Sequence, residues 1–156
     1  MARRTGGQTI EVEGLTETLK AFQGLEADLR KQANAELRGA AKTCAAVLAG
    51  RLVIAAESSG VPVAPRVARS IRVKSDRLPV VSIGGPRKVG TGKRGSAAAL
   101  VWGSEQGPKS EPNHFGVGAN PAGYWIAPTV AAFAGDQAVE LYRRAVYKTM
   151  HSYGLL

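Results

Sequence analysis

A long apolar stripe at helical spacing constrains the fold of this chain more than any other feature of its sequence. From Leu15 to Leu52, apolar side chains recur at steps of three and four residues, which is the period of one face of an α-helix. Charged residues such as Lys20, Arg30 and Lys42 occupy the other faces. The pattern predicts an amphipathic helical region, and the stripe consists of Leu15, Leu19, Phe22, Leu25, Leu29, Ala33, Leu37, Ala40, Ala41, Cys44, Leu48 and Leu52.

Residues that favour helix boundaries mark the limits of this region. Gly24 is expected to divide it into a short helix and a long helix that runs from about 26 to 56. The sequence Ser58-Ser59-Gly60 is expected to end the long helix, and Pro62 and Pro65 are expected to prevent it from resuming.

A strand pair is predicted after the long helix. Residues 71–83 are rich in β-branched side chains, with a turn near Asp76–Pro79. A glycine-rich loop follows at 84–96, and Ala97–Trp102 is a further candidate strand.

The C-terminal part is predicted to be a loop and then a helix. Residues 104–123 are polar and rich in glycine and proline, which indicates a loop. A last helix is expected to begin near Pro128, because proline is tolerated in a first helical turn, and Gly154 is expected to end it.

Helices that bracket a short run of strands indicate an α+β fold. We expect the long N-terminal helix and the C-terminal helix to pack on a small antiparallel β-sheet, from which the glycine-rich basic loop extends. A length of 156 residues argues for a single domain over 1–156, with 1–9 as a flexible N-terminal arm. Because aromatic residues make up only 6% of the chain, the core must be built mainly from Ala, Leu, Val and Ile.

Positive charge is concentrated in one central segment. The whole chain has a net charge of +9, and nine basic residues against one acid, Asp76, leave 66–94 alone a net charge of +8. Such a segment is expected to face polyanions or an acidic protein neighbour; the alternative is a solvated face that only keeps the protein soluble. The basic residues are Arg66, Arg69, Arg72, Lys74, Arg77, Arg87, Lys88, Lys93 and Arg94.

The loop at 84–96 is interpreted as a mobile hairpin that gains structure against a partner or hangs into a channel, because glycines at this density cost much backbone entropy to order. The alternative is a surface loop without a partner. Residues 90–95 match the dinucleotide-binding spacing G-x-G-x-x-G, but that site requires a strand before it and a helix after it. The candidate strand Ala97–Trp102 follows instead, so no nucleotide cofactor is predicted.

No arrangement of side chains in the sequence indicates catalysis or metal binding, so we expect neither enzymatic activity nor a cofactor. Cys44, His114 and His151 do not lie at zinc-ligand spacing, and no nucleophile motif accompanies His114. A single cysteine fits a reducing compartment. No apolar run resembles a signal peptide or approaches the ~18 consecutive residues of a membrane span, so no membrane partner is expected.

Trp102, Tyr124 and Trp125 are among the few aromatic residues of the chain. They are interpreted as side chains that anchor loops onto the core. The alternative is that they anchor a subunit interface, because aromatic residues are enriched at interface hot spots.

The order of several short motifs resembles that of the tail-completion, or head–tail joining, proteins of long-tailed phages. In that family a glycine-leucine start precedes an alanine-rich helix, an Ala-Pro element and a Ser-Ile stretch. An aromatic-glycine turn and an aromatic segment that opens the last helix come next. The corresponding motifs here are Gly14-Leu15, Ala64-Pro65, Arg69-Ser70-Ile71, Val101-Trp102-Gly103-Ser104 and Tyr124-Trp125-Ile126-Ala127-Pro128. The family's glycine and leucine are replaced around Val67-Ala68, and no acid precedes Trp102.

The resemblance, which spans about residues 10–150, implies a structural virion protein. Such proteins form a homo-oligomeric ring, commonly a hexamer, at the head-proximal end of the tail or in the neck. The ring joins the head connector to the tail, contacts the terminator, connector or tail-tube proteins, and lets double-stranded DNA pass. The implied location is the virion, assembled in the host cytoplasm.

Three further functions remain open from the sequence. The chain is alternatively a tail terminator or a connector (stopper) ring of the same neck, or a free non-specific DNA-binding protein. In each case the basic side chains expected to face DNA or a partner are Arg66, Arg69, Arg72, Arg87, Lys88, Lys93 and Arg94, and the expected interface anchors are Trp102, Tyr124 and Trp125.

Overall fold

The structure is a computed structural model, and it describes residues 27–75, 79–90, 95–108 and 115–154. The flexible arm at 1–9, the short helix before Gly24 and the tip of the predicted turn lie outside the described residues, as do Lys93, Arg94 and His114.

Helix α2 (Ala27–Ser58) is the longest element of the fold, and it confirms the predicted long helix within two residues at each end. It buries one face from Ala33 to Ala56, as the apolar stripe predicts. Some members of the stripe lie off that face: Leu29 is exposed, and Ala40 and Cys44 are half-buried. The buried residues of α2 are Ala33, Leu37, Ala41, Ala45, Leu48, Leu52 and Ala56.

Serines and a glycine end α2, as predicted. The Ser58 hydroxyl donates to the Ile54 carbonyl at 3.0 Å, and the Ser59 hydroxyl donates to the Ala56 carbonyl at 2.8 Å. Gly60 follows with a φ of +72°, a conformation that few other residues adopt. The long helix does not resume after Gly60, as predicted, but a separate short helix that the sequence analysis did not predict follows it. Helix α3 (Ala64–Ala68) begins with Pro65 in its first turn, where the missing N–H has no helical partner to lose.

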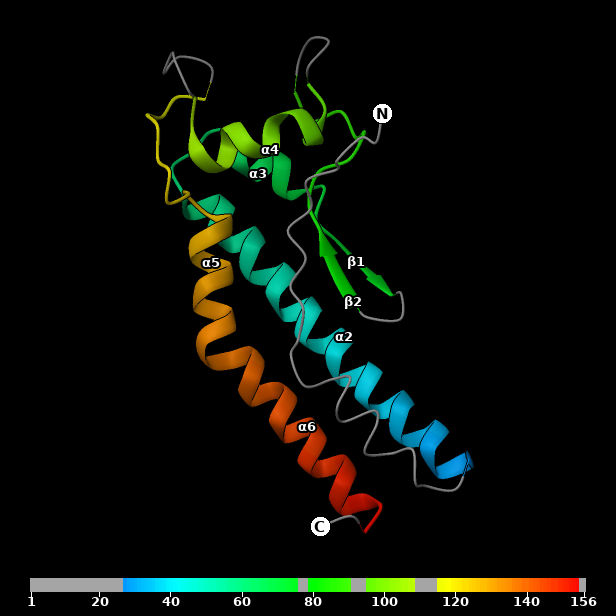
Figure 1. Ribbon diagram of the computed structural model, residues 1–156. Helices are drawn as coiled ribbons and strands as arrows, with labels where there is room; N and C mark the ends of the chain where they lie inside the picture. The colour runs from blue at the N-terminus through cyan, green and yellow to red at the C-terminus, as the bar shows by residue number, and fades with distance from the viewer. Residues whose placement is uncertain (1–26, 76–78, 91–94, 109–114, 155–156) are drawn as a thin grey trace, which may run out of the picture.

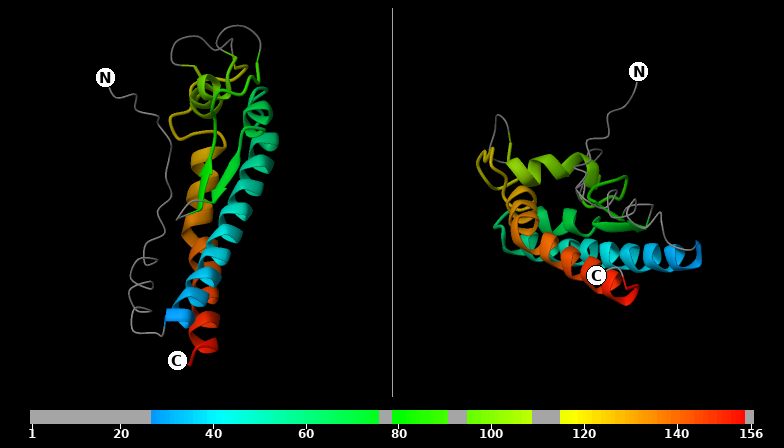
Figure 2. Two further views of the ribbon diagram at one scale, coloured as in Figure 1. Left: turned by 90° about the vertical axis from the view of Figure 1, so that its right-hand side faces the viewer. Right: turned by 60° about the horizontal axis from the view of Figure 1, so that its bottom comes forward.

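The C-terminal helical segment consists of α5 (Ile126–Ala132), a π-helical turn, η3 (Phe133–Gln137), and α6 (Ala138–Ser152). It begins two residues before Pro128 and stops before Gly154, whose φ is +65°. It runs beside α2 towards the end at which α2 begins (Figures 1 and 2).

The sheet has two antiparallel strands, β1 (Arg72–Ser75) and β2 (Pro79–Ser82), paired from Arg72 with Ser82 to Ser75 with Pro79. Both strands pack on α2, which also contacts α6. The predicted α+β fold, with two long helices and a small antiparallel sheet, is confirmed.

Ala97–Trp102 was wrongly predicted to be a strand. These residues begin α4 (Ala97–Gln106), which also includes the start of the predicted 104–123 loop. The Ser96 side chain caps this helix by accepting a hydrogen bond from the Ala99 N–H at 3.3 Å. Three consecutive alanines and a leucine then favour the helix.

The main core lies at one end of the molecule, where α3, α4 and α5 meet the last turns of α2 (Figure 1). Its largest fully buried side chains include Trp125, Leu52, Val61 and Val67. A second, smaller cluster joins Ala33 and Leu37 to α6 near the opposite end. The molecule is therefore elongated, with a head at one end of a helix pair (Figure 2).

Of the described helices, α2 is long and apolar enough to cross a membrane by length and composition, with a mean hydropathy of 1.4 over an 18-residue window. The core helix of a soluble protein passes the same test. In this fold α2 packs against α3, α5, α6 and both strands.

Candidate functional site

The glycine-rich segment forms a hairpin whose base is fixed by backbone hydrogen bonds. The N–H groups of Val89 and Gly90 both donate to the Gly95 carbonyl at 2.8 Å, and Lys88 pairs with Ser96. The Ala97 N–H donates to the Arg87 carbonyl at 2.8 Å, which joins the hairpin to the start of α4. These hydrogen bonds join the two described ends of the predicted 84–96 loop, and residues 91–94 between them lie outside the described residues.

The base of the hairpin is also tied to α3. The buried Ser70 hydroxyl accepts a hydrogen bond from the Gly84 N–H at 2.8 Å and donates one to the Val67 carbonyl at 2.6 Å. The Arg87 guanidinium donates to the Arg69 carbonyl at 2.9 Å. Two segments that are separate in the sequence are thus held together.

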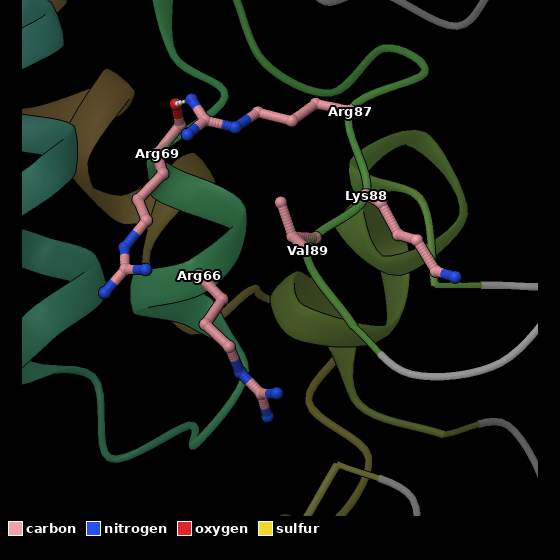
Figure 3. Close-up of a pocket in the computed structure, with 5 residues that line it drawn as sticks. All are labelled: Arg66, Arg69, Arg87, Lys88 and Val89. Carbon is pink, nitrogen blue, oxygen red and sulfur yellow. Dashed lines mark hydrogen bonds between the residues drawn. The ribbon is translucent and has the colours of Figure 1, made fainter.

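A hollow of about 150 Å³ lies between these two segments (Figure 3). Arg66 and Arg69 reach it from α3 and its C-terminal cap, and Arg87, Lys88 and Val89 reach it from the hairpin. All four basic side chains are exposed, whereas Val89 is half-buried. Four of the seven basic residues that the sequence analysis named therefore line the same hollow.

The other three selected basic residues do not line this hollow. Arg72 is exposed on β1, the strand that follows α3, together with Lys74. Lys93 and Arg94 are outside the described residues. The positive surface therefore continues from the hollow onto the sheet.

No acid neutralises the hollow among the residues that the structure describes. The salt bridge found among the described residues lies elsewhere, on α6, where Arg144 and Glu140 have a nitrogen–oxygen distance of 2.7 Å. Four cations around one hollow, with no acid paired to them among the described residues, produce a local positive potential that attracts an anion. Arginine is well suited to such a site because its planar guanidinium matches the oxygen atoms of phosphate or carboxylate.

The finding that α4 is a helix does not turn the glycine motif at 90–95 into a nucleotide-binding site. A helix does follow Gly95, as a dinucleotide site requires, but the sheet described here has two antiparallel strands and no βαβ crossover.

Glu105 is a structural residue that the sequence reasoning missed. It is 3% exposed, and its carboxylate accepts hydrogen bonds from the N–H groups of Trp125, Ile126 and Ala127 at 3.1, 2.7 and 2.7 Å. It thereby caps α5, whose own N-cap residue, Trp125, provides no side-chain cap. The helix predicted to begin near Pro128 has no Ser, Thr, Asp or Asn immediately before that proline to accept its first backbone N–H groups. This was the signal that an acceptor from elsewhere in the chain is needed.

The three selected aromatic residues lie in different environments. Trp125 is 1% exposed, and its indole N–H donates to the Ser104 carbonyl at 3.1 Å. Tyr124 is half-buried and donates to the Gly118 carbonyl at 2.9 Å. Trp102 is 49% exposed on α4. Trp125 and Tyr124 thus hold the loop before α5 on α4, and Trp102 leaves much of its ring accessible.

Cys44 is a half-buried free cysteine in α2. Desolvation by burial raises the pKa of its thiol, and this outweighs a backbone hydrogen bond that acts in the opposite direction. The neutral, weakly nucleophilic form is therefore favoured. Within the described part of the chain, no group of three or more His, Cys, Asp and Glu side chains is placed to hold a metal ion.

No family model, curated protein or solved structure matches this chain.

Proposed function

We propose that this chain is a structural subunit that packs side by side with its own copies in a ring at the head-proximal end of a phage tail or neck. The ring joins the head connector to the tail and lets DNA pass. The order of the sequence motifs motivates the phage assignment, and an exposed apolar face on α2 supports self-association.

That face consists of side chains on one line of the helix. Leu29, Val47 and Ile54 follow one another at intervals of about five and about two helical turns of 3.6 residues, and Ile54 is 65% exposed. Between Val47 and Ile54 lies the exposed Gly50, and Thr43 precedes Val47 by one turn. The one charged residue from Thr43 to Ile54 is Arg51, four residues after Val47; it is half-buried, and its guanidinium lies 5.8 Å from the centre of the Phe133 ring.

Small and apolar residues in this arrangement suit close contact with a second copy of the chain. An added Cβ at Gly50 would meet no atom within 4 Å, so the helix backbone is open to a neighbour at this point. Exposed apolar patches of this kind mark protein interfaces. A closed ring also needs a second, different patch on each subunit, and α6 with the exposed Val139 and Tyr147 offers one.

Native mass spectrometry of the purified chain, with and without neighbouring tail proteins, tests the proposal. We expect a closed oligomer, and we expect Val47→Gln with Ile54→Gln to shift it towards monomers while the melting temperature stays within a few degrees. The matched control is Ala35→Gln, an exposed substitution on another face of the same helix. A wild-type chain that stays monomeric even with its neighbours would contradict the proposal.

The partner that binds the ring separates the tail-completion role from its two close alternatives. A terminator binds the tail tube, whereas a connector or stopper ring binds the head. Pull-down of the assembled ring against each neighbour separately distinguishes these layers, because each layer has a different pair of neighbours.

A further inference from the structure

We propose that the hollow formed by Arg66, Arg69, Arg87 and Lys88 is a phosphate-binding site that holds the backbone of double-stranded DNA without reading its sequence. The site itself does not depend on the ring. Only the identity of the natural ligand, the DNA that passes through a neck, rests on the proposed function.

The backbone around the hollow is preorganised. The hydrogen bonds of Ser70 fix the base of the hairpin against α3, and those of Gly95 and Ala97 fix its two arms. The two walls that carry the cations are thus set before a ligand arrives. A preorganised site binds more tightly because less conformational freedom is lost on binding.

The residues that line the hollow carry many hydrogen-bond donors. Arg87 uses part of its guanidinium to bond the Arg69 carbonyl, and each guanidinium has five N–H groups. Arg66 and Arg69 line the hollow on the α3 side and Lys88 lines it on the hairpin side, and their charged ends point in different directions (Figure 3). A phosphate group offers several oxygen acceptors in one small volume, and charge-assisted bonds to it are the strong ones.

The composition of the lining favours nucleic acid over an acidic protein. Protein interfaces have an apolar core enriched in aromatic residues, whereas among the described residues Val89 is the one apolar residue that lines this hollow. The exposed Arg72 and Lys74 extend the positive charge onto β1. A row of cations beside a single hollow fits a chain of regularly spaced phosphates, whose binding is driven by counterion release.

The described residues that line the hollow include no aromatic ring, and this favours duplex DNA over single-stranded DNA. Proteins that hold single strands stack the bases on aromatic side chains. A hollow lined by cations and a valine contacts the backbone alone, which a duplex presents on its outside.

The test measures the affinity of the full chain for a short mixed-sequence DNA duplex as a function of salt. The site variant is Arg66→Gln, Arg69→Gln and Lys88→Gln, with Arg87 kept because it bonds α3. The control is Arg38→Gln, Lys42→Gln and Lys148→Gln, which removes the same charge from exposed positions on α2 and α6. Circular dichroism must show that both variants are folded.

We expect the site variant to lose roughly ten-fold or more in affinity at ~100 mM salt, and the slope of log K against log salt to fall by about 2–3. The control is expected to lose far less, because exposed charges beyond a Debye length of about 10 Å are screened. Equal losses in the two variants would overturn the site.

Three other probes identify the source of the phosphate. Inorganic pyrophosphate should raise the melting temperature of the wild type more than that of the site variant. Polyglutamate should compete poorly with DNA at equal charge, and equal competition would overturn the phosphate assignment in favour of an acidic protein. Vesicles with anionic phospholipids that bind as tightly as DNA would overturn DNA as the ligand.

Failure of the phosphate site can be distinguished from failure of the proposed ring, because DNA binding and assembly are measured separately. A site variant that still assembles but no longer binds DNA supports this inference and leaves the ring intact. A wild-type chain that binds DNA through the hollow but never assembles overturns the ring alone.

Discussion

At the scale of single residues, Glu105 connects two helices that are distant in the sequence. Its carboxylate is buried and accepts three backbone N–H groups at the start of α5, while its carbonyl accepts the Tyr124 N–H at 2.7 Å. Gly123 lies against this carboxylate, so that a Cβ at that position would overlap it. The loop before α5 is thus built around one side chain.

Glu105→Ala is expected to lower the free energy of unfolding by about 2–4 kcal/mol. The substitution leaves three N–H groups without their acceptor, and each buried unsatisfied donor carries a desolvation penalty. Urea denaturation followed by circular dichroism measures the loss. Glu57→Ala, an exposed carboxylate near the end of α2, is the control and should change the stability by less than about 0.5 kcal/mol. Similar losses for both would mean that the cap contributes nothing specific.

The proximity of the basic residues was predictable from their place in one charged segment, whereas a residue that acts on a remote partner was not. The sequence marked Arg66, Arg69, Arg87 and Lys88 as members of one basic segment, and the structure brings these four together. It did not indicate Glu105, because the residues that this side chain caps follow some twenty positions later and only the fold brings them near.

At the scale of elements, periodicity predicted the long elements and failed on a short one. The stripe of α2 repeats over many turns, so its helical period is unambiguous. α4 has ten residues, and Leu100, Val101 and Trp102 within it are typical of strands as well as of buried helices. The deciding feature was the local cap at Ser96 followed by alanines, which the hydrophobic pattern alone does not weigh.

Two glycines in helices are expected to respond with opposite sign when replaced by alanine. Gly39 lies in α2 where a Cβ would meet no atom within 4 Å, so Gly39→Ala should stabilise the protein by about 0.5–1 kcal/mol through helix propensity. In α4, a Cβ at Gly103 would overlap the Phe115 ring, so Gly103→Ala should destabilise by about 1–2 kcal/mol despite the same gain in propensity.

Thermal and urea denaturation of the two variants, in parallel with the wild type, checks this pair. Each variant serves as the control for the other, because the chemical change is identical and only the surroundings differ. A stabilised Gly103→Ala would show that Phe115 moves aside at little cost, and the close packing of α4 on that ring would then be unimportant.

At the scale of the whole molecule, stability is unevenly distributed along the helix pair. The head contains the large core around Leu52, Val61 and Trp125, whereas the opposite end is held by Ala33 and Leu37 against α6. There Glu36 accepts hydrogen bonds from Thr149 at 3.2 Å and Tyr153 at 3.4 Å. Desolvation and the Glu36 carboxylate raise the pKa of Tyr153, so this residue stays a neutral donor up to alkaline pH.

This asymmetry predicts a gradient of amide hydrogen exchange along α2. Protection should be highest around Leu52, which is 1% exposed within the main core, and should fall towards Ala33, because fewer buried contacts resist local opening there. Exchange measured by mass spectrometry on the isolated chain tests this gradient. Uniform protection along α2 would show that the helix opens only when the whole molecule unfolds.

The same measurement on the assembled protein connects the gradient to the proposed ring. A second copy packed on the face of Val47 and Ile54 removes water from one side of α2 and couples its opening to loss of the neighbour. Protection should then rise from Thr43 to Ile54 in the oligomer and stay unchanged in the Val47→Gln, Ile54→Gln variant. An increase confined to the α3–hairpin surface would instead place the subunit contact on the basic side of the molecule, where the phosphate site could then no longer face DNA.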